Sequence, residues 1–142
     1  MANETLDLEN IVDVIRSAAK RVTSSKLAVG EVLVETSGHL TAEEIAERAQ
    51  KIVSSLSNSS VYRILEEFEE LNIVVHAHLG QQAAVYHLAT SIHGHLTCEA
   101  CGATYEIPAK HFDKLSAELA ATYGFSLDRH HVALTGTCKS CQ

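Results

Sequence analysis

Metal-binding side chains gather in the second half of the sequence. Cys98 and Cys101 form one Cys-x-x-Cys pair, and Cys138 and Cys141 form another near the C-terminus. Four thiolates suit tetrahedral Zn²⁺ and leave no open coordination position, which is typical of a structural site rather than a catalytic one. Buried free thiols, a redox Cys-x-x-Cys or a rubredoxin-like iron site would use the same residues. The presence of two pairs favours structural zinc.

The two cysteine pairs are unusually far apart. Residues 102–137 separate them, whereas a simple zinc ribbon has roughly 15–20 residues in that place. The pairs must therefore meet across a folded unit. Its expected parts are two short strands in "HLTCEACGATYEI", a helix over 109–123 opened by Pro108 and ended by Gly124, and a last strand in "HHVALTGTC". Phe112, Leu115 and Leu119 are expected to point inward from that helix.

Nine histidines form a second group of potential ligands. Residues two apart share one face of a strand, so the side chains of His93 and His95 are expected on one face. The same rule applies to His76 and His78. For any single histidine a surface role is the simpler interpretation, but the repeated spacing favours metal binding. If the two halves of the chain fold against each other, four imidazoles suited to Zn, Ni, Cu or Fe could converge at the hinge: His39, His87, His93 and His95.

The first half of the sequence predicts helices followed by a hairpin. Apolar spacing indicates helices over 7–21 and 26–36, the latter with Gly30 as a weak point. Thr41 and Glu44 form a capping-box pattern at the start of a third helix. A fourth follows the cap candidates in residues 57–59 and has an apolar stripe: Val61, Ile64, Leu65, Phe68 and Leu71.

The segments "IVVHAH" and "AAVYHL" then alternate as a β-hairpin does. Helices followed by a hairpin suggest a winged helix-turn-helix, and the whole chain is predicted to have an α+β fold. We expect a winged-helix DNA-binding domain over 1–90 and a small α/β dimerisation and metal-binding domain over 91–142.

The fourth helix carries the candidate DNA-reading residues. Tyr62 and Arg63 lie outside its apolar stripe, in the first turns, beside the small Ser60. On the helix alone, a solvated arginine and a half-packed tyrosine are the simpler interpretation. The predicted wing shifts the balance towards a recognition helix that enters the major groove by its N-terminal end.

Charge and hydropathy limit the possible functions. The net charge of −7 argues against nucleic acid as a partner, although a basic segment without acids could contact phosphate: Arg16, Lys20, Arg21 and Lys26. No apolar run reaches the roughly 20 residues of a membrane span. The acidic, amphipathic start does not resemble a signal peptide, so a cytoplasmic location is expected. Thiols stay reduced there, which favours metal over disulfides.

Taken together, "SSVYRILEEFEEL", "HGHLTCEACG" and "GTCKSC" resemble the ferric-uptake-regulator family of bacterial metal-dependent repressors along nearly the whole chain. The resemblance implies that Tyr62 and Arg63 contact DNA and that Arg21 and Lys26 are basic positions near the second helix. Lys26 stands where arginine is usual, and Ser24 stands where proline is usual. The resemblance further implies a regulatory hinge site at the four histidines named above and a structural zinc site at the four cysteines.

Two further sites follow from the same resemblance. A third family site normally takes two residues that alternate with the hinge histidines, and Ile92 and Gly94 stand there. Its remaining ligands would be Asp113 and His130, so this site is expected to be lost. The segment "VHAHLGQQAAVYHL" is similar to the nickel-responsive branch, which implies a possible second regulatory site: His76, His78, and either His130 or His131.

These patterns predict a metal-responsive repressor. Its homodimer would bind palindromic operators in double-stranded DNA when a regulatory metal occupies the hinge histidines, with nickel favoured over zinc or iron. The alternatives are a peroxide sensor of the same family and an intracellular metal-storage or metal-delivery protein. No Ser/His/Asp or Cys/His arrangement indicates an enzyme, and neither a membrane nor a small-molecule substrate is expected as a partner.

Overall fold

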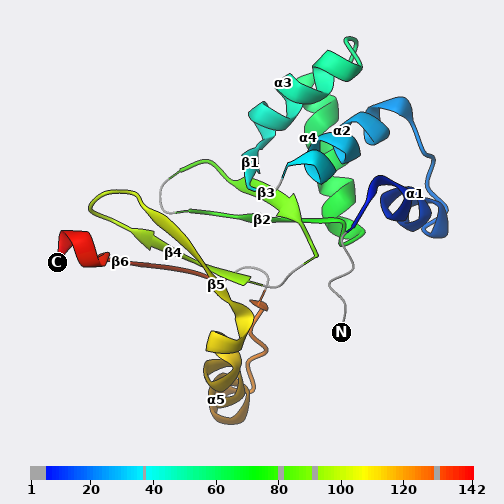
Figure 1. The fold of residues 1–142 in the computed structure, drawn as a ribbon. Coiled ribbons are helices and arrows are strands. Elements are labelled where there is room, and N and C mark those ends of the chain that lie inside the picture. The colour runs from blue at the N-terminus through cyan, green and yellow to red at the C-terminus, as the bar shows by residue number, and fades with distance from the viewer. Residues whose placement is uncertain (1–5, 37, 80–81, 91–92, 130–131) are drawn as a thin grey trace. The chain divides into compact units, whose positions relative to one another are not determined.

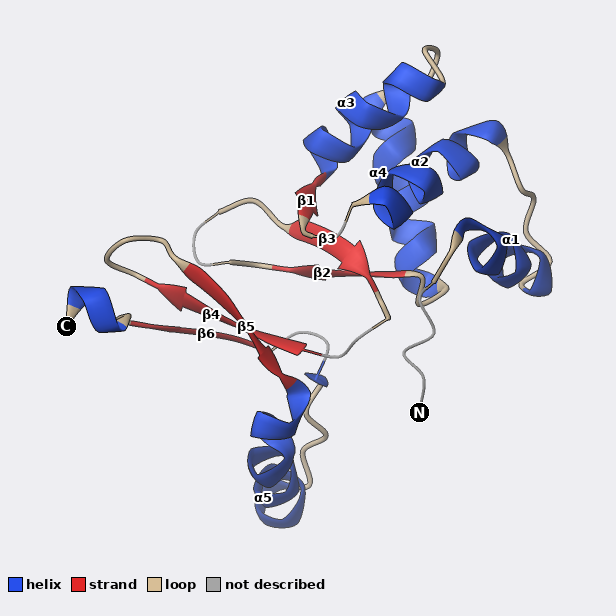
Figure 2. Cartoon of the chain, in the orientation of Figure 1, coloured by secondary structure: helices blue, strands red, loops and turns tan. Residues whose placement is uncertain are grey.

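The computed structural model describes residues 6–36, 38–79, 82–90, 93–129 and 132–142. His130, His131 and Ile92 therefore lie outside the described residues. The chain forms two compact units, one comprising residues 1–76 with 84–91 and the other comprising residues 77–83 with 92–142. Figures 1 and 2 show their elements, and each unit is described by itself. No helix in the described ranges combines the length and the apolar character needed to cross a membrane.

Four helices build most of the first unit. Each begins at a side chain that accepts a backbone N–H of the first turn, so each satisfies a donor that the helix itself leaves unpaired. The capping residues are Asp7, Thr23, Thr41 and Ser57. The helices are α1 (Leu8–Ser17), α2 (Ser24–Glu35), α3 (Ala42–Ile52) and α4 (Asn58–Glu70).

The helices pack around one apolar core. Fully buried side chains come from every helix, among them Ile15, Val29, Ile45, Leu65 and Phe68. The capping box predicted at Thr41 and Glu44 is confirmed, with both reciprocal hydrogen bonds present. Of the stripe predicted for α4, all members are buried except Leu71, which is half-buried.

A three-stranded sheet completes the winged helix. Its strands are β1 (Leu40–Thr41), β2 (Val74–Ala77) and β3 (Val85–Leu88), in the spatial order β1-β3-β2. β1 runs antiparallel to β3, with Leu40 opposite Tyr86 and Thr41 opposite Val85. The predicted hairpin is thus present. The sequence did not predict β1, because two residues are too few to show the alternation of a strand.

The second unit is a small α/β layer. β4 (His93–Cys98) lies between antiparallel β5 (Thr104–Pro108) and parallel β6 (Ala133–Gly136). The 3₁₀ helix η1 (Ala109–Phe112) leads into α5 (Asp113–Tyr123), and η3 (Lys139–Cys141) follows β6. Gly124 ends α5 in the left-handed conformation at φ 62°, as predicted. The α+β fold expected from the sequence is confirmed.

Three expected details are corrected. α1 stops at Ser17 rather than at residue 21, because Ala19 turns the chain at φ 56°. α2 begins at Ser24, two residues early, because the Thr23 hydroxyl caps it. Leu115 was expected to point inward from α5, but 42% of its surface is exposed.

Candidate metal centres and nucleic-acid interface

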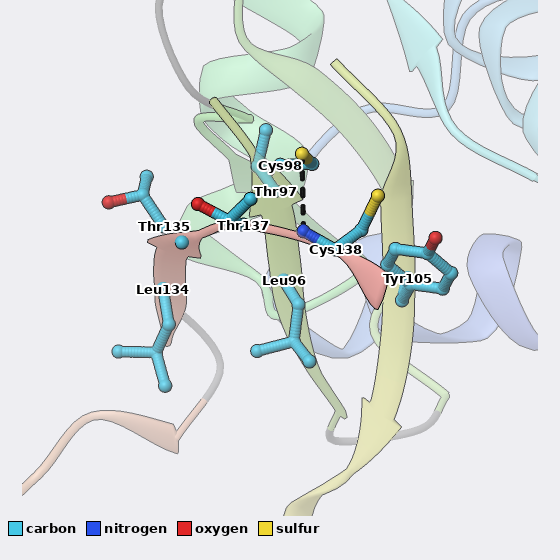
Figure 3. A pocket seen from close by; sticks show the side chains of 9 residues that line it. Leu96, Thr97, Cys98, Tyr105, Leu134, Thr135, Thr137 and Cys138 are labelled. Atoms are coloured by element: carbon cyan, nitrogen blue, oxygen red, sulfur yellow. Dashed lines mark hydrogen bonds between the residues drawn. The ribbon is translucent and has the colours of Figure 1, made fainter. Parts of the chain in front are cut away.

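The four cysteines form one cluster in the second unit. Their sulfur atoms all lie within 4.8 Å of one another. The strand register explains this meeting of distant segments, because Gly136 of β6 is opposite Cys98, the last residue of β4. The chain then turns so that the Cys138 N–H donates to Cys98 Sγ at 3.3 Å (Figure 3). Cys101, from the turn before β5, has its sulfur 3.7 Å from that of Cys138.

The thiols of this cluster differ in acidity. Backbone N–H donors, that of Cys138 above all, stabilise the Cys98 thiolate and lower its pKa to about 6. The neighbouring sulfurs of Cys138 and Cys101 raise the pKa of Cys141 to about 12. Four sulfurs at this spacing repel one another once ionised unless a cation lies among them. The donor set and its compactness fit tetrahedral Zn²⁺ with no open position.

Each unit also contains a pair of adjacent histidine rings. In the first unit, continuing the β1–β3 register by one residue places His39 opposite His87, and the two ring centroids are 4.6 Å apart. In the second unit, His93 and His95 lie on the same face of β4 with centroids 4.8 Å apart. Each pair can offer two nitrogen donors to one metal ion.

Glu106 is a further candidate ligand that the sequence did not reveal. It lies directly opposite His95 in the β4–β5 pairing, so both side chains emerge on the same face of that sheet. The alternation of side chains along "TYEIP" was visible in the sequence. The strand register that places Glu106 beside a histidine was not.

The wing histidines occupy different environments. His76 Nδ1 contacts the carboxylate of Glu69 on α4 and is half-buried. His78 follows β2 and is exposed. Because His130 and His131 lie outside the described residues, the ligand set predicted for a second regulatory metal remains a prediction.

The position of the third family site is filled by packing. The Phe112 ring lies on Gly94, so closely that an added Cβ at this glycine would be 2.3 Å from a ring carbon. Asp113, a remaining acid of that site, forms an ion pair with Arg129, which also donates to the Ala109 carbonyl at 3.0 Å. Position 94 thus has no room for a ligating side chain, and the Asp113 carboxylate is already paired with the Arg129 guanidinium.

The candidate DNA-reading residues lie on the outer side of α4. Tyr62 is 42% exposed and Arg63 is exposed, whereas the residues on either side of this pair, Val61 and Ile64, are buried. The Ser60 hydroxyl lies 2.8 Å from that of Ser57, within the helix cap. Tyr62 Oη donates a hydrogen bond to Glu43 Oε1 on α3 at 2.6 Å, a partner that the sequence pattern did not indicate.

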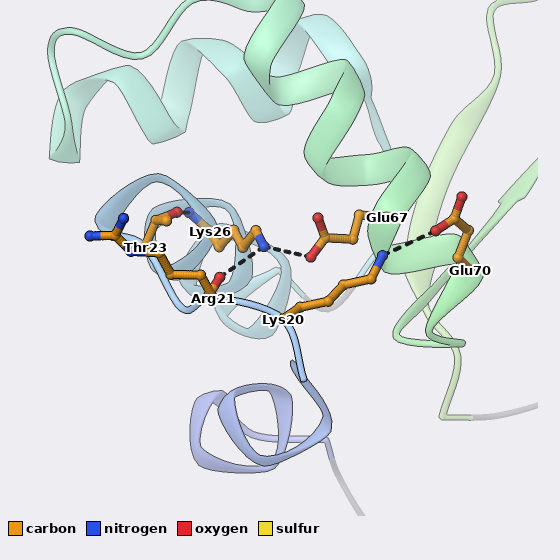
Figure 4. A network of polar contacts seen from close by, with 6 residues as sticks. All are labelled: Lys20, Arg21, Thr23, Lys26, Glu67 and Glu70. Atoms are coloured by element: carbon orange, nitrogen blue, oxygen red, sulfur yellow. Dashed lines mark hydrogen bonds and ion pairs between the residues drawn. The ribbon is translucent and has the colours of Figure 1, made fainter. Parts of the chain in front are cut away.

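The basic segment is partly used within the fold (Figure 4). Lys26 Nζ lies 2.6 Å from Glu67 Oε1 and donates to the Arg21 carbonyl at 2.8 Å. Lys20 pairs with Glu70 at 3.2 Å. Both acids belong to α4, so these lysines join the segment before α2, and α2 itself, to the candidate recognition helix. Arg21 keeps an exposed side chain and is the more available candidate for a phosphate contact.

Comparisons with known proteins agree with this geometry. The model of the ferric uptake regulator family matches residues 17–135. The ferric uptake regulation protein of Vibrio cholerae is 30% identical over 128 residues, which cover 89% of this chain and 85% of that protein. The peroxide operon regulator of Bacillus subtilis is 26% identical over 135 residues, which cover 95% and 93%. A solved structure of the Helicobacter pylori ferric uptake regulator superposes with a TM-score of 0.75 at 26% identity and covers 100% of this chain and 95% of that one.

The fold and the cysteine cluster define a winged-helix protein joined to a small α/β unit that can hold a metal ion. The chain belongs to the ferric uptake regulator family of metal-responsive transcriptional regulators. Members of that family are regulators rather than enzymes.

Proposed function

We propose that this protein is a homodimeric, metal-dependent repressor that binds palindromic DNA when a regulatory metal occupies His39, His87, His93 and His95. The two histidine pairs, with ring centroids 4.6 and 4.8 Å apart, are the observation that carries this proposal. One pair belongs to each unit, so a metal ion that takes ligands from both would fix the winged helix relative to the second unit. Without the metal, the DNA-competent arrangement is less populated and the apparent affinity for DNA falls.

The donor set is compatible with nickel, which we favour as the regulatory metal. An all-imidazole site suits Ni²⁺, while Zn²⁺ and Fe²⁺ accept the same ligands. A carboxylate from Glu106 beside His95 would move the preference towards harder ions. The zinc proposed at Cys98, Cys101, Cys138 and Cys141 keeps the second unit folded and takes no part in sensing.

Exposed apolar side chains on the second unit support the dimer. Leu96, Tyr105 and Leu134 are in register across the three strands, where they line a hollow of about 150 Å³ (Figure 3). Tyr105 is 50% exposed and Leu134 is 45% exposed. β6 is an edge strand, and edge strands pair readily with another strand. A second copy joined there would extend the sheet and cover the apolar row.

The test is DNA binding titrated against metals. Duplex DNA would be selected from a randomised library with protein purified from its own host, whose metal content is measured. Affinity for the selected duplex is then measured by fluorescence anisotropy with chelator and with Ni²⁺, Zn²⁺, Fe²⁺ or Mn²⁺. We expect one metal to raise the affinity strongly. Equal affinity with each metal and with chelator would contradict the switch.

The variant Arg63→Ala separates a repressor from a metal-storage protein. Arg63 is exposed on α4, so its loss should leave the fold intact and weaken binding to the selected duplex roughly 10- to 100-fold. The matched control is Lys114→Ala on α5, which removes one exposed positive charge from the other unit. If the protein stored metal, neither substitution would change its affinity for DNA, and both variants would bind metal as the wild type does.

The likeness to the Bacillus subtilis peroxide operon regulator favours a second candidate, a peroxide sensor. In that case, iron-loaded protein exposed to hydrogen peroxide should gain one oxygen atom on a ligand histidine and lose DNA affinity. Mass spectrometry of the tryptic peptides that contain the four proposed ligand histidines, one with His39 and one with His87, His93 and His95, decides between the two candidates.

A further inference from the structure

A hydrogen bond between the first turns of the two helices of the helix-turn-helix lies on their exposed side. Tyr62 Oη donates to Glu43 Oε1 at 2.6 Å. Glu43 lies in the first turn of α3, and Tyr62 lies in the first turns of α4. Both side chains are exposed, so the bond lies on the surface that carries the candidate DNA-reading residues.

The protonation states of the two partners suit this bond at neutral pH. The phenol stabilises the carboxylate and lowers the pKa of Glu43, while the carboxylate raises the pKa of Tyr62. The donor is therefore a neutral phenol and the acceptor an ionised carboxylate, a combination that gives short and strong hydrogen bonds.

We propose that Glu43 is a specificity-determining residue of the DNA-binding surface, because its carboxylate holds the Tyr62 phenol in one direction. This inference rests on the proposed function of DNA binding. A tyrosine ring that is held in one orientation contacts a base edge in one way, whereas a freely rotating ring makes contacts that depend less on the base sequence. The carboxylate also places negative charge where a DNA phosphate would approach, so it opposes loose backbone binding.

A structural role for Glu43 would have different consequences. An acid in the first turn stabilises a helix through its dipole, and Glu43 is one of two acids in that turn of α3. Such an effect would not depend on Tyr62 and would change the stability of the fold rather than the choice of DNA sequence.

The experiment compares Glu43→Ala, Glu43→Gln, Tyr62→Phe and the double variant Glu43→Ala/Tyr62→Phe. Each protein is loaded with zinc and with the regulatory metal, and is then titrated with the library-selected duplex and with poly(dI-dC). Glu43→Ala and Tyr62→Phe should each lower the ratio of the two affinities about tenfold, and the double variant should lose no more than one single variant. Glu43→Gln keeps an acceptor for the phenol, so it should retain affinity for the selected duplex and bind poly(dI-dC) more tightly.

The matched control is Glu47→Gln on the same helix. The Glu47 carboxylate pairs with Lys51 instead, so this variant removes the same charge without touching Tyr62 and should leave the affinity ratio unchanged. An unchanged ratio in Glu43→Ala, or additive losses in the double variant, would overturn the inference. If wild-type protein bound no selected duplex with any metal, the proposed function would fall together with the inference.

A measurement without DNA distinguishes failure of the inference on Glu43 from failure of the proposed function. Ionisation of the tyrosines is followed by ultraviolet absorbance as pH rises. One tyrosine should ionise at lower pH in Glu43→Ala than in wild type, because the carboxylate that raises its pKa is gone. Glu47→Gln should titrate as wild type. Identical curves for Glu43→Ala and wild type would show that Glu43 does not hold the phenol, whatever the protein binds.

Discussion

The ammonium of Lys26 lies 2.6 Å from the carboxylate of Glu67, and this pair joins α2 to α4, the candidate recognition helix. The two side chains are only 12% and 22% exposed. Water screens such a pair less than a surface pair, so more of the attraction is retained. The same ammonium donates to the Arg21 carbonyl. Lys26 therefore acts on α4 from within the fold, in addition to any contact that it makes with DNA.

Replacing Lys26 with alanine should lower the free energy of unfolding by about 1–3 kcal/mol, because the Glu67 carboxylate would be left partly buried without its partner. Urea denaturation of zinc-loaded protein, followed by far-ultraviolet circular dichroism, measures the loss.

Lys51→Ala provides the comparison for that variant. Lys51 and Glu47 are 4.0 Å apart and 73% and 76% exposed, so the loss there should stay below about 0.5 kcal/mol. Equal losses for Lys26→Ala and Lys51→Ala would show that the Lys26 pair contributes no more than a surface ion pair.

The close contact between Gly94 and Phe112 leads to a second prediction. Atoms of the Phe112 ring lie 2.3 and 2.5 Å from the place of a Cβ at residue 94, and Phe112 is itself buried. Gly94→Ala should therefore displace the ring and destabilise the second unit by about 1–3 kcal/mol. Thermal unfolding should show the loss, and Gly94→Ala/Phe112→Leu should recover part of it because leucine can move aside.

Gly136 on β6 is the control for this substitution. Nothing lies within 4 Å of a Cβ at Gly136, and the residue belongs to the same sheet as Gly94. Gly136→Ala should change the melting temperature little. A larger loss in Gly136→Ala than in Gly94→Ala would contradict the steric explanation.

The sequence predicted those features that depend on local rules. The Thr41 capping box, the stripe of α4 and the end of α5 at Gly124 follow from neighbouring residues alone, and all are present. The cysteine cluster was predictable as well, because paired Cys-x-x-Cys motifs carry a donor set of known chemistry.

The features that the sequence did not predict depend on contacts between distant residues. The sequence pattern indicated no partner for Glu67, Glu43 or Glu106. Only helix packing and strand register place these acids beside Lys26, Tyr62 and His95, respectively. The sequence placed Gly94 at a family site expected to be lost, but it did not indicate that the Phe112 ring lies on this glycine. Periodicity reports which face of an element a residue occupies but not which residue it meets.

The histidine pair of β4 gives a third prediction. His93→Ala should weaken binding of the regulatory metal by more than about tenfold, because one of the four proposed imidazole donors is lost. DNA affinity should then no longer respond to that metal, while the zinc content stays unchanged because no cysteine is altered. Isothermal titration of zinc-loaded protein with Ni²⁺ measures the first effect. His111→Ala removes an exposed histidine of η1 and should bind the metal as wild type does.

The acidities of the cysteines predict how zinc binding depends on pH. In the metal-free cluster, Cys98 has a pKa of about 6 and Cys141 a pKa of about 12. At neutral pH Cys98 is already ionised, whereas zinc must displace the proton of Cys141. The apparent affinity for zinc should therefore fall by at least about tenfold for each unit of decrease in pH, and more steeply below about pH 6, where Cys98 also takes up a proton.

Competition with a chromophoric chelator over this pH range measures the dependence of zinc affinity on pH. Cys98→Ser removes the more acidic thiol of Cys98 and Cys141. It should therefore weaken zinc binding and abolish the steeper fall of zinc affinity at low pH. Zinc loss should also unfold the second unit, because the cluster holds the end of β4 to the segment after β6. Zinc occupancy that stayed constant under the chelator between about pH 8 and pH 5.5 would contradict a site built from these thiols.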